Sequence, residues 1–446
     1  MKISTKNSIQ FKIKNFILIL TMILTTSIFT IEAKGETLPP NINAEGVVLL
    51  DGNTGKVLYG KNEDQSLAPA STTKILTALI VLEKTNLNDI VTVGKNPPNA
   101  EGTSIGLKEG DQYTIEEILH GLLLESANDC AEALAEYVGG SIENFAKIMN
   151  DKARSLGAIN CNFVNPSGLY EDDHKTTAHD LALIMREVYK NPDFIRISRE
   201  PIFKFPPSKV DGLEKWVNNK NMLIRTSNSY YYPCAICGKT GYTTNSQHTY
   251  TAVAERNGQI LVLSILKCPD KDTYFKGSKD LFEYGFNNFK SLKLYSKGDE
   301  ISTYKINKNL EMPLIASQDF YYTIKNEDLK KFLNKDLKDV SNEEIISTLN
   351  PKVELENVNL KNKSFNRGDK ILNGSVKIND EVIGTLSLTA PIDREYSKLE
   401  TSYSFSSIPL IVIIIAVIAV ISILILIISK YSSHKKIKKF NNRFFN

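Results

Sequence analysis

Three short motifs in the chain combine a nucleophile, a potential base and polar groups that could hold a substrate. The first is Ser71-Thr-Thr-Lys74, at the start of a segment whose apolar residues recur at helical spacing. In a helix these two side chains share one face, a turn apart, with the hydroxyl close to the positive N-terminus. An amine can act as base for a serine when burial and a second cation lower its pKa toward neutrality. Ser71 and Lys74 are therefore candidates for a nucleophile and its base.

The Ser-x-x-Lys pattern alone is weak, because the chain contains it five times. The copy at Ser264 lies on a predicted strand, where three-residue spacing sends side chains to opposite faces. The copy at Ser302 has no helix after it, and the copies at Ser432 and Ser433 lie in the basic tail. Only Ser71 stands at the start of a helix. A helix-capping serine beside a surface lysine remains the alternative interpretation of this pair.

Two further motifs strengthen the catalytic interpretation. Ser126-Ala-Asn128 lies in a break between two predicted helices, where side chains can point into a cleft, and Lys239-Thr-Gly241 occurs once, on a predicted strand. Gly241 leaves room for a substrate backbone beside that strand. Ser-x-x-Lys, Ser-x-Asn and Lys-Thr-Gly, in this order, are shared by penicillin-binding proteins and class A β-lactamases. Here 55 residues separate Ser71 from Ser126, and 113 separate Ser126 from Lys239.

The elements that must position these motifs alternate between helices and strands. A hairpin is predicted over 46–59, helices over 71–84, 115–124, 129–138 and 177–189, and strands over 239–244, 249–255 and 259–267. Thr114 and Glu117 form a capping box before the second helix. Strands at both ends of residues 40–290, with helices between them, predict an antiparallel sheet with helices packed on it. Residues 291–398 alternate in short strands and predict a small β domain with a helical insert near 327–349.

The two ends of the chain predict export and anchoring. Four lysines precede a mostly apolar stretch, so residues 1–33 are predicted to be a signal peptide, with a retained anchor as the alternative. Residues 408–429 are 22 almost purely apolar residues without charge, which is enough for a transmembrane helix. The basic residues of 430–446 then place the C-terminus in the cytoplasm and residues 34–407 outside the cell. The net charge of 34–429 is −6, which argues against a nucleic-acid partner.

Residues 40–290 resemble the low-molecular-weight penicillin-binding proteins, the serine D-alanyl-D-alanine carboxypeptidases. Beyond the three motifs, the segments Asn165–Leu169, Thr177–Ala182 and Lys239–Thr243 look like that family's connecting segments. The trailing β domain fits too, so the resemblance covers roughly residues 40–398. It implies an α+β fold of the penicillin-binding and β-lactamase-like transpeptidase class, followed by a small all-β domain and a C-terminal transmembrane helix. The segment 245–248 departs from the family, which often has a small residue and a glycine there, and the helical insert is longer than expected.

Carried onto matching positions, the resemblance assigns the chemical roles. It implies Ser71 as the acylated nucleophile, Lys74 as its base and Ser126 as the proton relay to the leaving D-alanine. The backbone amides of Ser71 and Tyr242 would form the oxyanion hole. Lys239 would help to keep Lys74 neutral by like-charge repulsion.

The resemblance also assigns the substrate-binding groups. Asn128 would hold the substrate amide, and Lys239 and Thr240 would bind the terminal carboxylate, beside Gly241 and Tyr242 on the same strand. The expected substrates are peptidoglycan stem peptides that end in D-Ala-D-Ala, and β-lactam antibiotics are expected as covalent inhibitors. No metal and no other cofactor is implied.

Three related functions remain as alternatives. A D,D-endopeptidase of peptidoglycan cross-links would differ only in what the rim of the site admits. A β-lactamase would need a carboxylate that directs water onto the acyl-enzyme, and the sequence does not identify one. A catalytically silent wall-binding protein is disfavoured because every motif residue is intact.

The histidines and cysteines suggest weaker hypotheses. A Ser-His-Asp hydrolase would need His120, His174, His179 or His248 near a serine. His174 and His179 lie among aspartates without making a convincing metal site. The five cysteines are an odd number for an exported protein; buried free thiols are favoured over a disulfide or a zinc site at Cys234-Ala-Ile-Cys237.

Overall fold

The computed structural model describes residues 38–308, 310–335, 337, 340–396 and 408–441. The predicted signal peptide, residues 1–33, lies outside this range. The described chain divides into two compact units. The first contains the residues up to Leu292 together with Tyr321–Val340, and the second contains Lys293–Phe320 and the residues from Ser341 onward.

The first unit is built on a five-stranded antiparallel sheet, as the motif order predicts. The strand order is β2-β1-β9-β8-β7. The strands are β1 (Gly46–Asp51), β2 (Val57–Lys61), β7 (Ala235–Thr243), β8 (Gln247–Arg256) and β9 (Gln259–Cys268). The turn between β8 and β9 has positive φ at both Asn257 and Gly258, the geometry of a tight hairpin. Strand β7, which carries Lys239-Thr-Gly241, is an edge strand of the sheet.

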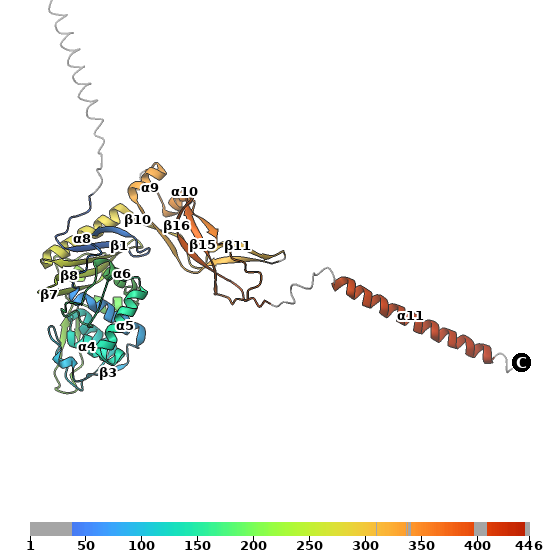
Figure 1. The fold of residues 1–446 in the computed structure, drawn as a ribbon, viewed down its shortest axis with the longest axis horizontal. Helices are drawn as coiled ribbons and strands as arrows, with labels where there is room; N and C mark the ends of the chain where they lie inside the picture. The colour runs from blue at the N-terminus through green and yellow to red at the C-terminus, as the bar shows by residue number, and fades with distance from the viewer. Residues whose placement is uncertain (1–37, 309, 336, 338–339, 397–407, 442–446) are drawn as a thin grey trace, which may run out of the picture. The chain divides into compact units, whose positions relative to one another are not determined.

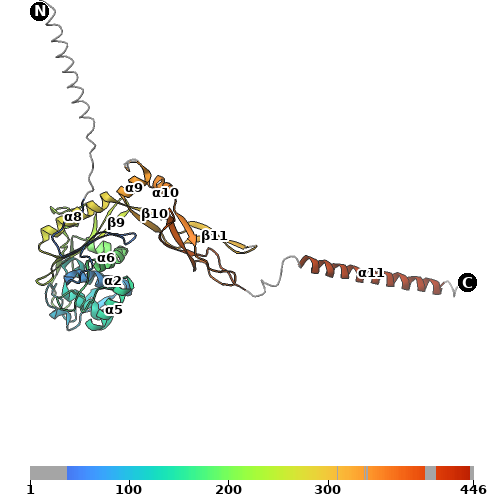
Figure 2. The same ribbon diagram turned by 45° about the horizontal axis from the view of Figure 1, so that its top comes forward.

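Helices cover both faces of this sheet (Figure 1). Helix α8 (Lys271–Asn288) packs on one face, and α6 (Ala178–Val188), with α2 (Lys74–Lys84) beyond it, packs on the other, which Figure 2 shows from a second side. Val47 and Leu49 of β1 belong to the core beside α8, whereas Val48 and Leu50 belong to the core beside α2 and α6. A strand buried on both faces needs apolar residues at successive positions, which explains this unbroken run.

The first unit contains further helices on both sides of the sheet. They are η1 (Ala70–Thr73), η2 (Pro97–Asn99), α3 (Ile115–His120), η3 (Gly121–Glu125), α4 (Asn128–Gly139), α5 (Ile142–Ser155), α7 (Pro192–Arg199), η4 (Met222–Ile224) and α9 (Asn326–Leu333). Two short hairpins accompany them: β3 (Ile90–Thr92) with β4 (Gln112–Thr114), and β5 (Ile202–Lys204) with β6 (Trp216–Asn218). The capping box of Thr114 and Glu117 is present.

Two predicted helices are subdivided in ways that matter for the site. The helix predicted over 71–84 begins as the 3₁₀ turn η1 and becomes α-helical only at Lys74. The helix predicted over 115–124 is α-helical to His120 and then widens into the single π-helical turn η3. Such turns are rare and occur frequently at functional sites. Both motif serines therefore lie at irregular helix ends rather than within regular helices.

The second unit contains a five-stranded sheet of order β11-β12-β16-β15-β14. Its strands are β11 (Glu300–Asn307), β12 (Leu310–Ala316), β14 (Lys352–Leu355), β15 (Lys370–Ile378) and β16 (Glu381–Thr389). The hairpin predicted at Asn379-Asp380 joins β15 to β16, with positive φ at both residues. Strands β10 (Phe289–Tyr295) and β13 (Phe320–Lys325) lie at the limits of the two units. The helical insert predicted over 327–349 consists of α9 and α10 (Asn342–Leu349).

Residues predicted to cross a membrane belong to helix α11 (Ile408–Asn441). The side chains of residues 414–415 and 417–431 are described. The large apolar side chains from Ile414 to Leu426 among them are about half exposed or more. Within the described residues, no helix meets the length and hydrophobicity that a membrane span requires. The structure therefore leaves the predicted transmembrane segment unsupported.

Candidate active site

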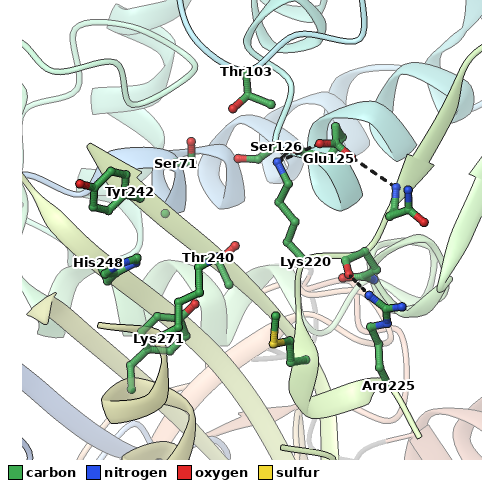
Figure 3. A pocket seen from close by; sticks show the side chains of 15 residues that line it. Ser71, Thr103, Glu125, Ser126, Lys220, Arg225, Thr240, Tyr242, His248 and Lys271 are labelled. Atoms are coloured by element: carbon green, nitrogen blue, oxygen red, sulfur yellow. Dashed lines mark hydrogen bonds and ion pairs between the residues drawn. The ribbon is translucent and has the colours of Figure 1, made fainter. Parts of the chain in front are cut away.

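A cleft of about 640 Å³ brings the three motifs together. Ser71 and Ser126 line its helical wall, and Thr240, Gly241 and Tyr242 line its strand wall. Figure 3 shows the two serines on one side and Thr240 and Tyr242 on the other. Residues separated by 55 and 113 positions in the sequence thus converge on one cavity, as the motif set predicts.

The backbone around Ser71 is held in an unusual conformation. Ala70, the residue before Ser71, has φ of +49°, in the left-handed region that L-residues rarely adopt. Gly168, with φ of +80°, lies against it: a Cβ on Gly168 would be 1.8 Å from the carbonyl oxygen of Ala70. Only glycine fits there. The segment Asn165–Leu169 therefore packs closely against the turn that carries Ser71 and supports its conformation.

The Lys74 ammonium is completely buried and makes three hydrogen bonds. Nζ lies 3.0 Å from Ser71 Oγ, 2.6 Å from Asn128 Oδ1 and 2.6 Å from the carbonyl oxygen of Ser167. Burial is the main reason that the pKa of Lys74 falls to about 7, and the positive charge of Lys220 lowers it further. A substantial fraction of Lys74 is therefore neutral near pH 7, the form that can accept a proton from Ser71.

Ser126 and Lys239 form a second pair across the cleft. Ser126 follows η3 with φ of +69°, and its Oγ accepts a hydrogen bond of 2.8 Å from Lys239 Nζ. Lys239 also donates to the carbonyl oxygen of Thr240, and its side chain is buried. Burial holds the pKa of Lys239 well below its usual range, and repulsion by Lys74 lowers it further. Each motif serine thus has its own buried lysine.

Asn128 connects the helical wall to Lys74. Its Oδ1 accepts from Lys74, and its Nδ2 donates to the carbonyl oxygen of Glu101 at 2.5 Å. Next to it, the buried carboxylate of Asp129 accepts hydrogen bonds from Ser104 and from the backbone N–H groups of Ile105 and Leu107. Asp129 therefore holds the loop of residues 103–107, whose Thr103 lines the cleft, in place. The sequence motifs did not reveal this role.

Gly241 lies against the start of the Ser71 turn. A Cβ on Gly241 would lie 2.8 Å from the backbone nitrogen of Ser71, 3.0 Å from that of Thr72 and 2.3 Å from Thr249 Oγ1. The missing side chain therefore lets β7 approach the nucleophile closely. Gly241 also lines the cleft, and the expected place for a substrate backbone beside this strand stays a prediction.

The histidines do not form a Ser-His-Asp arrangement in the described residues. His174 is buried: its Nε2 lies 2.9 Å from Thr73 Oγ1, and its Nδ1 accepts from the backbone N–H of Val164. Burial lowers the pKa of His174 to about 3, so the ring is neutral and supports η1. His179 Nδ1 lies 3.2 Å from Asp64 Oδ1. Across the described chain, no group of three or more His, Cys, Asp and Glu side chains is placed to hold a metal ion.

The five cysteines are free thiols in the structure. Cys130, Cys237 and Cys268 are buried, whereas Cys161 and Cys234 are partly exposed. Burial raises the pKa of Cys130 well above its usual range and that of Cys237 to about 12. The thiols of Cys130 and Cys237 are therefore protonated at neutral pH.

The sequence matches two known protein families. Residues 33–269 match the family described as D-alanyl-D-alanine carboxypeptidase, and residues 289–396 match the C-terminal domain of penicillin-binding protein 5. The first match covers more than half of the chain. The chain belongs to the D-alanyl-D-alanine carboxypeptidase family.

Known carboxypeptidases from distant bacteria are similar to this family member. DacB2 of Mycobacterium tuberculosis is 36% identical over 261 residues, which are 57% of this chain and 87% of the relative. DacF of Bacillus subtilis is 32% identical over 276 residues, which are 59% of this chain and 68% of the relative. The crystal structure of penicillin-binding protein 5 from Haemophilus influenzae superimposes with a TM-score of 0.63 at 26% identity, over 80% of this chain and 99% of that one.

These similarities confirm the resemblance seen in the motifs, the penicillin-binding fold with its C-terminal β domain, and the assignment as a serine carboxypeptidase. They do not bear on the predicted signal peptide or on the anchor.

Several residues of the carboxypeptidase cleft were not singled out by the motifs. Thr103, Glu125, Lys220, Arg225 and Lys271 line it together with the motif residues. They come from loops and helix ends whose spacing carries no periodic signal, so only the fold reveals them. Lys220 Nζ makes an ion pair of 2.9 Å with Glu125 Oε1.

The departure from the family at residues 245–248 is accommodated within this cleft. Gln247 has φ of +52°, in the left-handed region that glycine adopts most readily. Ser246 is buried and receives a hydrogen bond from Thr243 Oγ1. His248 lines the cleft and packs its ring 4.6 Å from that of the exposed Tyr242. The rim of the cleft therefore carries an aromatic pair at this segment.

Proposed function

We propose that this D-alanyl-D-alanine carboxypeptidase removes the terminal D-alanine from peptidoglycan stem peptides through an acyl-enzyme on Ser71. The observation that carries the proposal is the 3.0 Å hydrogen bond between Lys74 Nζ and Ser71 Oγ, made by a buried amine whose pKa is about 7. A neutral amine at this distance is within the range required of a general base.

Acylation follows from the two serine–lysine pairs. Neutral Lys74 takes the proton of Ser71 as Oγ attacks the carbonyl carbon of the penultimate D-alanine. The resulting oxyanion is stabilised by the backbone N–H groups of Ser71 and Tyr242. Glycine at residue 241 lets β7, which carries Tyr242, lie against the backbone of Ser71. The leaving amine receives its proton through Ser126, whose hydroxyl is oriented by Lys239. Water then attacks the ester and releases the shortened peptide.

Substrate binding uses the edge of the sheet. Among the described strands, β7 is at the edge of its sheet, so a peptide can lie along it as an added strand. At one end, Lys239 and Thr240 provide a cation and a hydroxyl for the terminal carboxylate. Asn128, which accepts a hydrogen bond from Lys74, is the candidate partner of the peptide amide. β-Lactams present a carboxylate and a reactive carbonyl in the same relation, so the same residues account for covalent inhibition.

The test is release of D-alanine by the full-length protein from a peptide that ends in D-Ala-D-Ala, together with mass spectrometry after incubation with penicillin. Wild-type protein should gain the mass of one penicillin, and Ser71→Ala should gain none. Ser302→Ala is the matched control, because Ser302 begins another Ser-x-x-Lys sequence, in β11, and should leave labelling intact. Labelling of the Ser71→Ala protein would refute the assignment of the nucleophile.

A second candidate function is D,D-endopeptidase activity on cross-linked peptides. The observation that favours it is the extent of the cleft, which continues past Thr240 to Met222, Arg225 and Lys271 and exceeds what a single leaving alanine requires. Cleavage of a purified cross-linked muropeptide dimer, followed by chromatography, distinguishes this activity from removal of terminal D-alanine alone.

The β-lactamase alternative is less well supported by the contacts. Among the described residues that line the cleft, Glu125 is the one carboxylate, and its two oxygens accept from Lys220 Nζ and from the backbone N–H of Asn218. Both carboxylate oxygens of Glu125 therefore already accept hydrogen bonds within the protein, which disfavours a role in directing water onto an acyl-enzyme. We expect the penicillin adduct to persist, and rapid turnover of penicillin would favour the β-lactamase instead.

We also infer that α11 anchors the protein to the membrane with the catalytic unit outside the cell. Support comes from the uncharged residues 408–429 and the lysines that follow them. Full-length protein should sediment with membranes and resist extraction at high pH, whereas a chain that ends at residue 400 should be released. Sedimentation of both would mean that another part of the chain holds the membrane.

A further inference from the structure

Glu125 and Lys220 are tied together directly beside Ser126. Lys220 Nζ donates to the carbonyl oxygen of Glu125 at 2.5 Å and to its carboxylate at 2.9 Å. The backbone N–H of Lys220 donates to the carbonyl oxygen of Leu124, and that of Asn218 donates to the Glu125 carboxylate. Figure 3 shows the Lys220 side chain reaching across to Glu125 and Ser126. Four bonds thus join the 218–220 loop to the end of η3.

These bonds satisfy groups that the helix itself leaves open. The last carbonyl groups of a helix have no partner within it, and a cation there is favoured by the helix dipole. In η3 the last two carbonyls are those of Leu124 and Glu125, and both accept hydrogen bonds from Lys220. The next residue, Ser126, must hold its left-handed conformation to keep Oγ 2.8 Å from Lys239.

The 218–220 loop is itself firmly positioned. Asn219 Nδ2 donates to the carbonyl oxygens of Ser198 and Glu200, at the end of α7. Asn221 accepts from Tyr250 of β8, in the central sheet. The loop therefore connects the end of η3 to fixed points on both sides, and Lys220 is the side chain that makes the connection to Ser126.

The pair also places one positive and one negative charge beside the two buried lysines. Charged or titratable neighbours that act on Lys74 are Cys130, Lys220, Asp129 and Glu132, and those that act on Lys239 are Lys74, Lys220 and Glu125. Lys220 is thus a cation that disfavours the charged form of both lysines. Glu125 is the carboxylate that opposes this effect at Lys239.

We propose that Glu125 and Lys220 form a positioning pair for the carboxypeptidase reaction: they fix Ser126 for proton transfer and balance the charge around Lys74 and Lys239. Both residues act through Ser126 and the buried lysines. The inference rests on the function proposed above, since it assigns a role in that reaction.

The first test compares Lys220→Met with Lys220→Arg in the full-length protein. Lys220→Met removes the bonds to Glu125 and should lower kcat about 10²-fold, the loss typical of a catalytic group displaced by about 1 Å. KM should change little, because Thr240 and Lys239 still bind the substrate. Lys220→Arg keeps a cation and donors and should restore most of kcat. Equal losses in the two variants would overturn a role for the charged hydrogen bonds.

The second test is the pH profile of kcat/KM, which a merely structural contact would not move in opposite directions. The acidic limb reports the loss of a proton from Lys74, and the basic limb reports the loss of a proton from Lys239. Lys220→Met removes a cation, so the pKa values of Lys74 and Lys239 should rise and both limbs should move to higher pH. Glu125→Gln keeps an acceptor for Lys220 but removes the negative charge, so the pKa of Lys239 should fall and the basic limb should move to lower pH. Movement of the basic limb in the same direction in both variants, or in neither, would overturn the charge-balance role.

A remote ion pair supplies the control. Lys152 Nζ lies 2.6 Å from Glu83 Oε1, so Lys152→Met removes a similar pair away from the cleft and should leave kcat and both limbs unchanged.

Penicillin labelling separates this inference from the proposed function. If the Lys220→Met protein is labelled and has wild-type kinetics, the pair has no positioning role and the carboxypeptidase assignment stands. If wild-type protein itself is not labelled, the proposed function fails first.

Discussion

The two walls of the cleft each bury a lysine beside a serine, yet the surroundings of the two lysines differ. On the helical wall, Lys74 has three acceptors and two carboxylates among its neighbours. On the strand wall, Lys239 has two acceptors, and two of the three charged groups acting on it are cations. The surroundings of Lys74 are therefore complete without a ligand, whereas at Lys239 the carboxylate of Glu125 opposes two cations, Lys74 and Lys220.

This difference separates the tasks of two chemically identical side chains. A base must be neutral when the substrate arrives, and burial of Lys74 achieves that without help from the substrate. A carboxylate receptor must be charged when the substrate is bound, and the substrate's own carboxylate can supply the favourable charge that keeps Lys239 protonated. The same residue type thus serves as base on one wall and as cation on the other because of what surrounds it.

The largest expected effect is the loss of acylation rate in Lys74 variants, which tests whether Lys74 acts as a base rather than as a cation. Lys74→Arg keeps a cation but cannot become neutral, because the guanidinium pKa is above 12. Acylation by penicillin, followed by quenched-flow mass spectrometry, should slow by about 10²–10⁴-fold in both Lys74→Arg and Lys74→Ala, the range for loss of a general base. Lys84→Ala, at the exposed end of α2, is the control and should acylate normally. Substantial activity in Lys74→Arg would mean that Lys74 acts as a charge.

Gly241→Ala tests the closeness of the two walls. The added methyl would meet the backbone nitrogen of Ser71 at 2.8 Å, so β7 must move away from the nucleophile. We expect kcat to fall about 10²-fold and the free energy of unfolding to fall by about 1–3 kcal/mol, as measured by denaturant titration. Gly384→Ala in β16 is the control, since its methyl would meet only the Phe320 ring, at 2.8 Å, in the second unit. Normal kcat in Gly241→Ala would show that the close approach is dispensable.

Lys239 provides the counterpart to the first prediction. Lys239→Ala should weaken kcat/KM for peptides with a free terminal carboxylate at least about tenfold more than for amidated peptides, because a buried charge–carboxylate hydrogen bond contributes about 1.5–3 kcal/mol. Lys239→Arg should retain part of the preference, because a cation suffices on this wall. Steady-state kinetics on matched free and amidated peptides measure the ratio. Equal losses on both substrates would mean that Lys239 does not recognise the carboxylate.

The sequence predicted the residues of both walls but not the arrangement that distinguishes them. Ser71, Ser126 and Lys239 were found because their spacing and order are specific, and β1 because an apolar run precedes the turn residues 51–55 of a predicted hairpin. The π-helical turn before Ser126 and the left-handed Ala70 were not predicted, since they depend on contacts with Lys220 and Gly168, distant in the chain. Gly241 was placed correctly on a strand, but its contact with the backbone of Ser71 was not predicted, because that neighbour is 170 residues away in the sequence.

The pH dependence of acylation gives the smallest effect and separates the two lysines without mutation. Since Lys74 must be neutral and its pKa is about 7, kcat/KM for penicillin acylation should fall about tenfold for each pH unit below that value.

Burial lowers both pKa values below those of the unfolded chain, so the unfolded state binds more protons and these lysines make folding less favourable as the pH falls. A bound carboxylate ligand favours protonated Lys239, so the rise in melting temperature that it produces should grow as the pH is lowered. Acylation that stays constant between pH 5 and 7 would show that Lys74 is not the titrating base, whatever the stability does.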